Sequence, residues 1–233
     1  MSDQAVVVEE KKVVVKEREP LFSKKNKKLI SDPLDENNPI TIQVLGICSA
    51  LAVTVQMKAA VVMSVAVLFV LILANVSISL IRNLIPNRIR IIVQLVVVAA
   101  LVIIVDQVLK AYLFDVSKEL SVFVGLIITN CIIMGRLEAF ALGNKPWPAA
   151  LDAIGNSLGY GMVLVIVSFF KELFGSGKLF GFEIFGNATE QTGLYAMGYM
   201  DNGLMLLPPS SLILVAVYIW IQKIRNPSLI ETH

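Results

Sequence analysis

The feature that decides the fold is an uncharged apolar stretch, residues 59–81, which reads AAVVMSVAVLFVLILANVSISLI. An α-helix rises about 1.5 Å per residue, and the hydrocarbon core of a bilayer is about 30 Å thick. As a helix, these 23 residues are therefore long enough to cross a membrane. The stretch predicts a transmembrane helix, and the rest of the chain repeats the pattern.

Five further segments are similarly poor in charge. Three of them are close to residues 59–81 in length and apolar nearly throughout, although Asp106 interrupts one of them. The other two are shorter, at 16 and 15 residues, and contain several polar side chains. The sequence thus predicts six transmembrane helices, at residues 40–55, 59–81, 91–113, 121–135, 153–170 and 203–222. The expected fold class is an all-α integral membrane protein.

The composition agrees with a membrane protein. Of the 233 residues, 56% are hydrophobic and 16% are charged, whereas a soluble domain has about 25% charged and about 45–50% apolar residues. Residues 1–38 alone hold 8 of the 20 Lys and Arg and 8 of the 18 Asp and Glu, so the remainder is sparsely charged. This pattern excludes a water-soluble enzyme core and a disordered chain. The net charge of +2 gives no reason to expect a nucleic-acid partner.

Basic residues in the loops predict the orientation. With residues 1–38 as a cytoplasmic arm, 15 of the 20 Lys and Arg lie on the inner side and 5 on the outer side. The membrane domain then covers 39–225, and 226–233 form a cytoplasmic tail. Residues 171–202, rich in Gly and Phe, form a long outer loop, which either lies against the membrane interface or a neighbouring subunit or is simply flexible.

The two short spans each carry one of the two cysteines, Cys48 and Cys131. They are the first members of two sets of three spans, and an odd number of spans gives the two halves opposite orientations in the membrane. Short, polar-interrupted segments at matching positions of inverted halves point to a site near the midplane. The cysteines could be small buried hydrophobes, a disulfide, or metal ligands. As ligands they supply only half of a four-thiolate site, so a second chain would supply the rest.

Two runs around the cysteines resemble a known family. They are residues 38–54, NPITIQVLGICSALAVT, and residues 129–141, TNCIIMGRLEAFA. Both resemble the D subunits of the bacterial Na+-translocating NADH:quinone oxidoreductases (Nqr), and the resemblance extends over roughly residues 21–225. The homologous subunit of the Rnf complexes typically has Pro-Leu-Leu after its first cysteine. Here Ser49-Ala50-Leu51 follows Cys48, which favours the Nqr side.

The resemblance implies a role in electron transfer. In this family, Cys48 and Cys131 would share a [2Fe–2S] centre with the paralogous E subunit, inside the bacterial inner membrane. The centre would relay electrons from the flavin of the F subunit to the FMN of the C subunit, coupled to Na+ export and quinone reduction. FMN, FAD and riboflavin are expected only in partner subunits, among A, B, C and F. This chain would bind neither NADH nor quinone, and it lacks a Gly-x-Gly-x-x-Gly fingerprint.

Three carboxylates in or beside the predicted spans are candidates for a cation path: Asp152, Asp106 and Glu138. Each also has a structural explanation. Asp152 opens the fifth span, where a helix N-terminus favours negative charge. Glu138 can pair with Arg136 or Lys145 at the interface, and Asp106 can lie at the outer headgroup level.

Two other functions fit the same sequence. One is the Rnf-type subunit, which links ferredoxin to NAD. The other is a self-standing secondary transporter, because inverted repeats and broken helices suit transporters equally well. An iron centre in the complex separates the transporter from the two electron-transfer functions.

Overall fold

The computed structural model describes residues 24–34, 37–86, 88–112, 125–176, 178–179, 182–183 and 203–226. Three helices in this part of the chain are long and apolar enough to cross a membrane: α3 (Met57–Ile81), α4 (Arg90–Tyr112) and α7 (Pro146–Ser176). The protein is therefore a multi-pass membrane protein with a helical architecture.

Shorter elements complete the described part. They are α1 (Lys24–Ser31), η1 (Asp32–Leu34), α2 (Ile47–Val53), α6 (Cys131–Arg136), the π-helical η2 (Leu137–Ala141), α8 (Gly203–Leu206) and α9 (Pro208–Arg225). Residues 125–128 form a further helical turn. Two-residue strands, β1 (Lys178–Leu179) and β2 (Phe182–Glu183), pair antiparallel.

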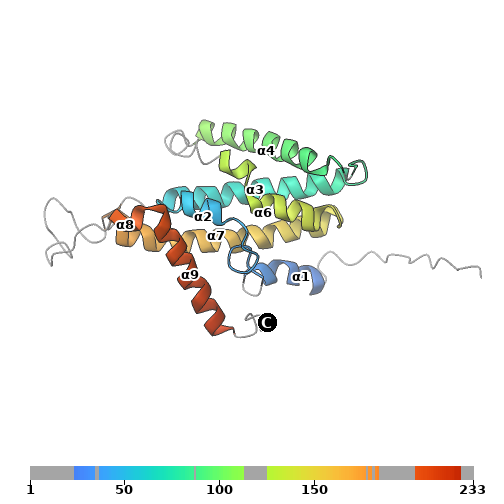
Figure 1. Ribbon diagram of the computed structural model, residues 1–233. Helices are drawn as coiled ribbons and strands as arrows, with labels where there is room; N and C mark the ends of the chain where they lie inside the picture. The colour runs from blue at the N-terminus through green and yellow to red at the C-terminus, as the bar shows by residue number, and fades with distance from the viewer. Residues whose placement is uncertain are drawn as a thin grey trace, which may run out of the picture.

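The centre of the molecule is the pair α3 and α7, which lie side by side (Figure 1). They run antiparallel, because the start of α3 meets the end of α7: the Met57 amide donates to Glu172 Oε2 at 2.6 Å. At the other end, Asn75 Nδ2 donates to the Ala149 carbonyl at 3.0 Å. Aliphatic side chains fill the space between, and the fully buried ones include Val67, Val70, Leu71 and Ala74 of α3 and Val163 and Leu164 of α7.

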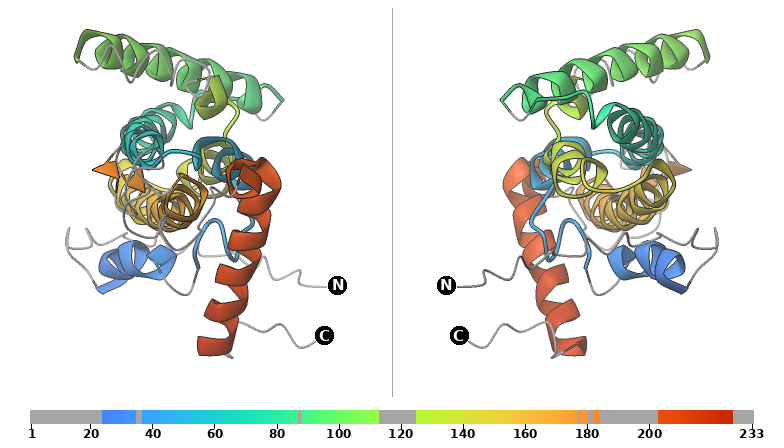
Figure 2. Two further views of the ribbon diagram at one scale, coloured as in Figure 1. Left: turned by 90° about the vertical axis from the view of Figure 1, so that its left-hand side faces the viewer. Right: turned by 90° about the vertical axis from the view of Figure 1, so that its right-hand side faces the viewer.

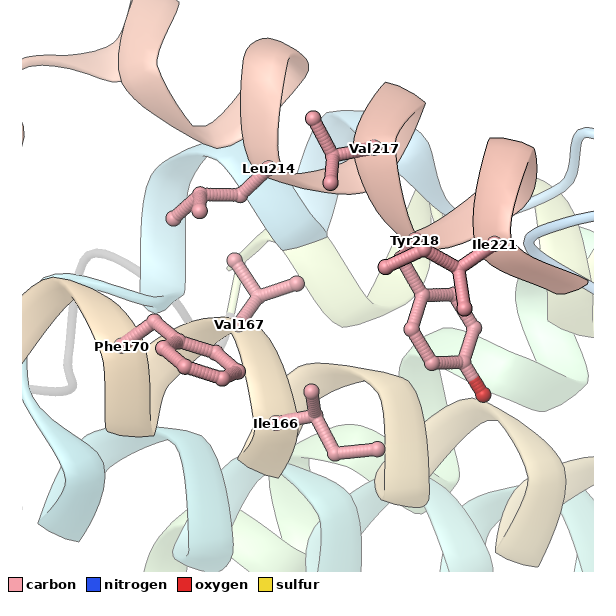
Figure 3. Close-up of a pocket in the computed structure, with 7 residues that line it drawn as sticks. All are labelled: Ile166, Val167, Phe170, Leu214, Val217, Tyr218 and Ile221. Atoms are coloured by element: carbon pink, nitrogen blue, oxygen red, sulfur yellow. The ribbon is translucent and has the colours of Figure 1, made fainter.

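Two long helices flank this pair in different ways. α4 forms an outer layer over α3, and only Val98 and Val102 of its large aliphatic side chains are buried. In the views along the bundle, α9 runs away from the other helices beside α2 (Figure 2). Its divergence from α7 leaves an apolar cavity of about 160 Å³. The cavity is lined by Ile166, Val167 and Phe170 of α7 and by Leu214, Val217, Tyr218 and Ile221 of α9 (Figure 3).

The end of the predicted N-terminal arm packs on the membrane domain. α1 and η1 lie along α7, where Gly155 and Gly159 present a surface without side chains. A Cβ on Gly155 would lie 2.5 Å from the Leu29 carbonyl oxygen, so only glycine permits this approach. Residues 29–34 are thus part of the folded domain, whereas residues 1–23 lie outside the described residues.

Several predicted boundaries are corrected by the structure. The fifth helix begins at Pro146 rather than at residue 153, and it continues to Ser176, so residues 171–176 are helical and not part of a loop. Of the first predicted span, only Ile47–Val53 is helical. The fourth span is interrupted at Thr129 and Asn130. The greater part of the predicted 171–202 loop lies outside the described residues.

Candidate metal centre

The two cysteines lie together although they are 83 positions apart in the sequence. Their sulfur atoms are 3.6 Å apart. A disulfide bond is about 2.05 Å long, so the pair is not bonded. Two thiolates on one tetrahedral metal ion, each about 2.3 Å from it, lie roughly 3.8 Å apart. The spacing therefore fits two ligands of one metal ion, as in an iron–sulfur centre.

Cys48 lies in the first turn of α2, and an irregular segment leads up to it. Residues 37–46 are not helical. Asn38 holds this segment: its Oδ1 accepts from the Ile40 amide at 3.0 Å, and its Nδ2 donates to the Gly159 carbonyl of α7 at 3.2 Å. Val44 has φ 57° and Gly46 has φ 83°, so the chain turns sharply into α2. A β-branched residue at positive φ is strained, which indicates that the surroundings impose this turn.

Cys131 is the first residue of α6, and Asn130 caps that helix. Asn130 Oδ1 accepts from the Ile132 amide at 3.3 Å. An asparagine cap of this kind satisfies a backbone N–H that has no partner within the helix. Because residues 125–128 are helical too, Thr129 and Asn130 form a break between two helical pieces, and Cys131 lies at that break. Both cysteines thus lie at the starts of short helices.

Tyr160 of α7 joins the two cysteine-bearing turns. Its hydroxyl lies 2.6 Å from Ser49 Oγ, next to Cys48, and accepts from Asn130 Nδ2, next to Cys131, at 3.4 Å. All three side chains are buried. The Tyr160 ring also lies close to Gly46: a Cβ there would be 2.9 Å from the ring. Tyr160 therefore positions both turns from one rigid helix.

Asp152 is the buried member of an ion pair. It is 2% exposed and accepts from the guanidinium of Arg136 through both of its oxygens, with 3.0 Å between Arg136 Nε and Asp152 Oδ2. Asn156 Nδ2 donates to the same carboxylate at 3.1 Å, and Arg136 also reaches Gln43 Oε1 at 3.4 Å. Since α7 begins at Pro146, Asp152 lies beyond the first turn of its helix, and the expected capping position is wrong.

The other two carboxylates have basic partners as well. Glu138, in η2, pairs with Arg90 at 2.6 Å and accepts from Gln94 at 3.1 Å, rather than pairing with Arg136 or Lys145. Asp106 pairs with Lys110 one turn further along α4, at 2.5 Å. The three candidate carboxylates lie in separate ion pairs, so the structure does not gather them into one site.

Sequence patterns alone miss three residues near the site: Tyr160, Lys171 and Glu172. Tyr160 gives no signal, because one tyrosine in an apolar helix resembles ordinary core. Lys171 and Glu172 do give a signal, because a charged pair that directly follows an apolar run can continue the same helix. Hydropathy places them in the loop instead, because it ends a span at the first charges.

Within the described residues, Cys48 and Cys131 have no third His, Cys, Asp or Glu beside them to complete a metal site. Among the residues that the structure describes, no cluster of three or more His, Cys, Asp or Glu side chains could hold a metal ion. A four-thiolate centre would therefore need two ligands from elsewhere.

Comparisons with known proteins show the family of the chain. The family model described as "Rnf-Nqr subunit, membrane protein" matches residues 26–219. The chain is also 54% identical over 209 residues to the D subunit of the Na(+)-translocating NADH-quinone reductase of Photobacterium profundum, and the match covers 90% of this chain and 97% of that protein. With broken helices around a cysteine pair and a family match over most of its length, the chain belongs to the Rnf-Nqr family of membrane subunits.

Proposed function

We propose that this chain, as a D-type subunit of a Na+-translocating NADH–quinone reductase, supplies Cys48 and Cys131 to an intramembrane [2Fe–2S] centre. The identity of 54% to a D subunit supports membership of that enzyme complex. The observation that carries the proposal is the 3.6 Å distance between the two sulfur atoms, at the starts of two short helices.

The second half of the centre comes from the paralogous E subunit. Two thiolates leave two positions on a four-thiolate cluster open. Cys48 is exposed on this chain, so its sulfur is accessible to a neighbouring subunit. The sequence pattern of two inverted three-span halves supports a partner that brings its own pair of cysteines to the same level of the membrane.

The residues of this chain hold and shield the centre. When bound, a [2Fe–2S] cluster would supply one-electron transfer between the flavin of the F subunit and the FMN of the C subunit. Cys48 and Cys131 would hold it, while Ser49, Asn130 and Tyr160 fix the turns that carry them. The buried aliphatic core of α3 and α7 keeps water from one side. FAD and riboflavin belong to the partner subunits, and NADH and quinone bind elsewhere in the complex.

The chain lies in the bacterial inner membrane with both termini in the cytoplasm. Six spans place the two ends on one side, and the basic residues of the arm and of the α9 end support the cytoplasmic side. Asp152, Asp106 and Glu138 are candidates for the Na+ path. Each carboxylate has a basic partner, so Na+ binding at any of them requires that Arg136, Lys110 or Arg90 move aside.

Electron paramagnetic resonance of the intact purified complex, with iron and acid-labile sulfide analysis, tests the proposal. We expect equal amounts of iron and sulfide, and a signal that develops on reduction with NADH. A complex that contains no iron and still transports Na+ would overturn the proposal in favour of a carrier.

A further inference from the structure

Lys171 is a buried positive charge within a membrane-spanning helix. Its side chain lies in α7, and the residue is fully buried. No ion pair joins it to a carboxylate in the described ranges of the chain. The adjacent Glu172 accepts instead from the Met57 amide. A buried ammonium is costly, and an ionisable group inside a membrane domain is a functional candidate for that reason.

A series of hydrogen bonds connects Lys171 to α2, the helix that carries Cys48. Lys171 Nζ lies 2.7 Å from Ser211 Oγ, which lies 3.3 Å from Thr54 Oγ1, which donates to the Ala50 carbonyl at 2.6 Å. An ammonium only donates, and the Thr54 hydrogen is used on Ala50. The Ser211 hydroxyl must therefore donate to Thr54, and every bond in the chain points from Lys171 toward α2.

The hydrogen-bond chain ends at the Ala50 carbonyl, in the helix that carries Cys48. Ala50 is two residues after Cys48, and Thr54 is the residue at the C-terminal end of α2. At about 1.5 Å per residue, the six steps from Cys48 to Thr54 span roughly 9 Å, and the Thr54–Ser211 and Ser211–Lys171 contacts of 3.3 Å and 2.7 Å separate Thr54 from the ammonium. Ser211, Thr54 and Ala50 are all buried. The charge thus acts on the sulfur site through protein rather than through water, where it would be screened.

We propose that Lys171 is a positioning residue whose positive charge stabilises the reduced, more negative form of the iron centre at Cys48 and Cys131. The proposal rests on the function proposed above. Reduction adds a negative charge, and a buried cation connected to the site through buried protein groups favours the state with that charge. Lys171 therefore raises the reduction potential of the centre and favours electron arrival from the upstream flavin.

Redox titration of the complete complex, followed by the resonance signal of the iron centre, tests this. Lys171→Met keeps the length of the side chain and removes its charge, and we expect a midpoint potential more negative than in the wild type, with iron content unchanged. Lys171→Arg keeps the charge and should stay close to the wild type. Lys223→Met, which removes an exposed lysine at the other end of α9, is the matched control and should not shift the midpoint.

Two further variants keep the test decisive if Lys171→Met fails to assemble. Ser211→Ala and Thr54→Val keep the lysine but break the hydrogen-bond chain, and each should shift the midpoint in the same direction by a smaller amount. If Lys171→Met has full iron content and an unshifted midpoint, the inference is overturned but the proposed function stands. If Lys171→Met does not assemble, the same result in both Ser211→Ala and Thr54→Val overturns the inference in the same way. A wild-type complex without iron would overturn the proposed function and the inference with it.

Discussion

The two short helices that carry the cysteines reach the same point by different local structures. α2 begins after a strained turn, with Val44 at φ 57° and Gly46 at φ 83°. α6 begins with an ordinary side-chain cap from Asn130. On the α2 side the surrounding fold imposes the backbone conformation, whereas on the α6 side a single local hydrogen bond explains it.

The far ends of the two helices differ in charge. α2 ends against the hydrogen-bond chain from Lys171, which has no carboxylate partner within the described part of the chain. α6 ends at Arg136, whose charge Asp152 neutralises. Cys48 and Cys131 therefore occupy similar positions in their helices, but the charge beyond the end of α2 is unpaired within the described residues and the charge at the end of α6 is neutralised. Removing the charge near α2 should alter the redox potential, whereas breaking the ion pair near α6 should mainly alter stability.

The largest effect is expected when a cysteine, the one feature that α2 and α6 share, is removed. Cys48→Ala and Cys131→Ala should each abolish the iron signal, because three thiolates hold the cluster poorly and leave a position open to solvent. Quinone reduction and Na+ transport should fail together, while NADH oxidation by the upstream flavin persists as an internal control. Iron analysis and quinone-reductase assays check this. Retention of iron and full activity in either variant would make that cysteine a packing residue.

The next effect falls on the α6 side. Asp152→Asn leaves the partly buried Arg136 without a carboxylate, and we expect a loss of about 3 kcal/mol in the free energy of unfolding, measured as the thermal stability of the complex. If Asp152 is also on the cation path, the Na+ concentration for half-maximal turnover should rise while the iron signal stays intact.

A double variant separates these two roles of Asp152. Arg136→Gln combined with Asp152→Asn removes both charges and should recover part of the stability, but not the Na+ dependence. Unchanged thermal stability in the single variant would contradict the structural role of the pair. An unchanged Na+ curve would remove Asp152 from the path.

A smaller effect tests the strained turn on the α2 side. Gly46→Ala puts a side chain at positive φ and against the Tyr160 ring, and should cost about 1–3 kcal/mol of stability. Gly125→Ala is the matched control: a Cβ there meets no atom within 4 Å, so stability should not fall. Thermal denaturation of both variants checks this, and equal stabilities would show that the turn does not require glycine.

The smallest effect concerns the link between the two sides. Tyr160→Phe keeps the ring but removes the hydroxyl that contacts Ser49 and Asn130, and should cost about 1 kcal/mol. The resonance signal of the iron centre should broaden, because the two cysteine turns are less firmly fixed. Tyr218→Phe on α9 makes the same chemical change away from the cysteines and should leave the signal unaltered. A signal of wild-type width in Tyr160→Phe would show that packing alone fixes the turns.

Much of this arrangement is local and could be read from the sequence. Long uncharged runs predicted α3 and α4 to within a few residues, because the length of an apolar helix is set by the bilayer it crosses. The breaks near Cys48 and Cys131 were also indicated, since Gly46 and Asn130 are residues that interrupt or cap helices. The predicted ends of α7 were wrong. Proline is accepted at a helix start, and charged residues can continue a helix when they have partners.

The sequence by itself determined that the chain enters the membrane and that two broken spans carry its cysteines, because hydropathy and helix breaking depend on neighbouring residues. Only the tertiary structure decided which polar groups meet. Arg136 meets Asp152, Tyr160 meets Ser49 and Asn130, and Lys171 meets Ser211 40 positions away. These contacts form because α7 packs antiparallel to α3 and passes both short helices, and a buried polar group takes the partner that packing brings within reach.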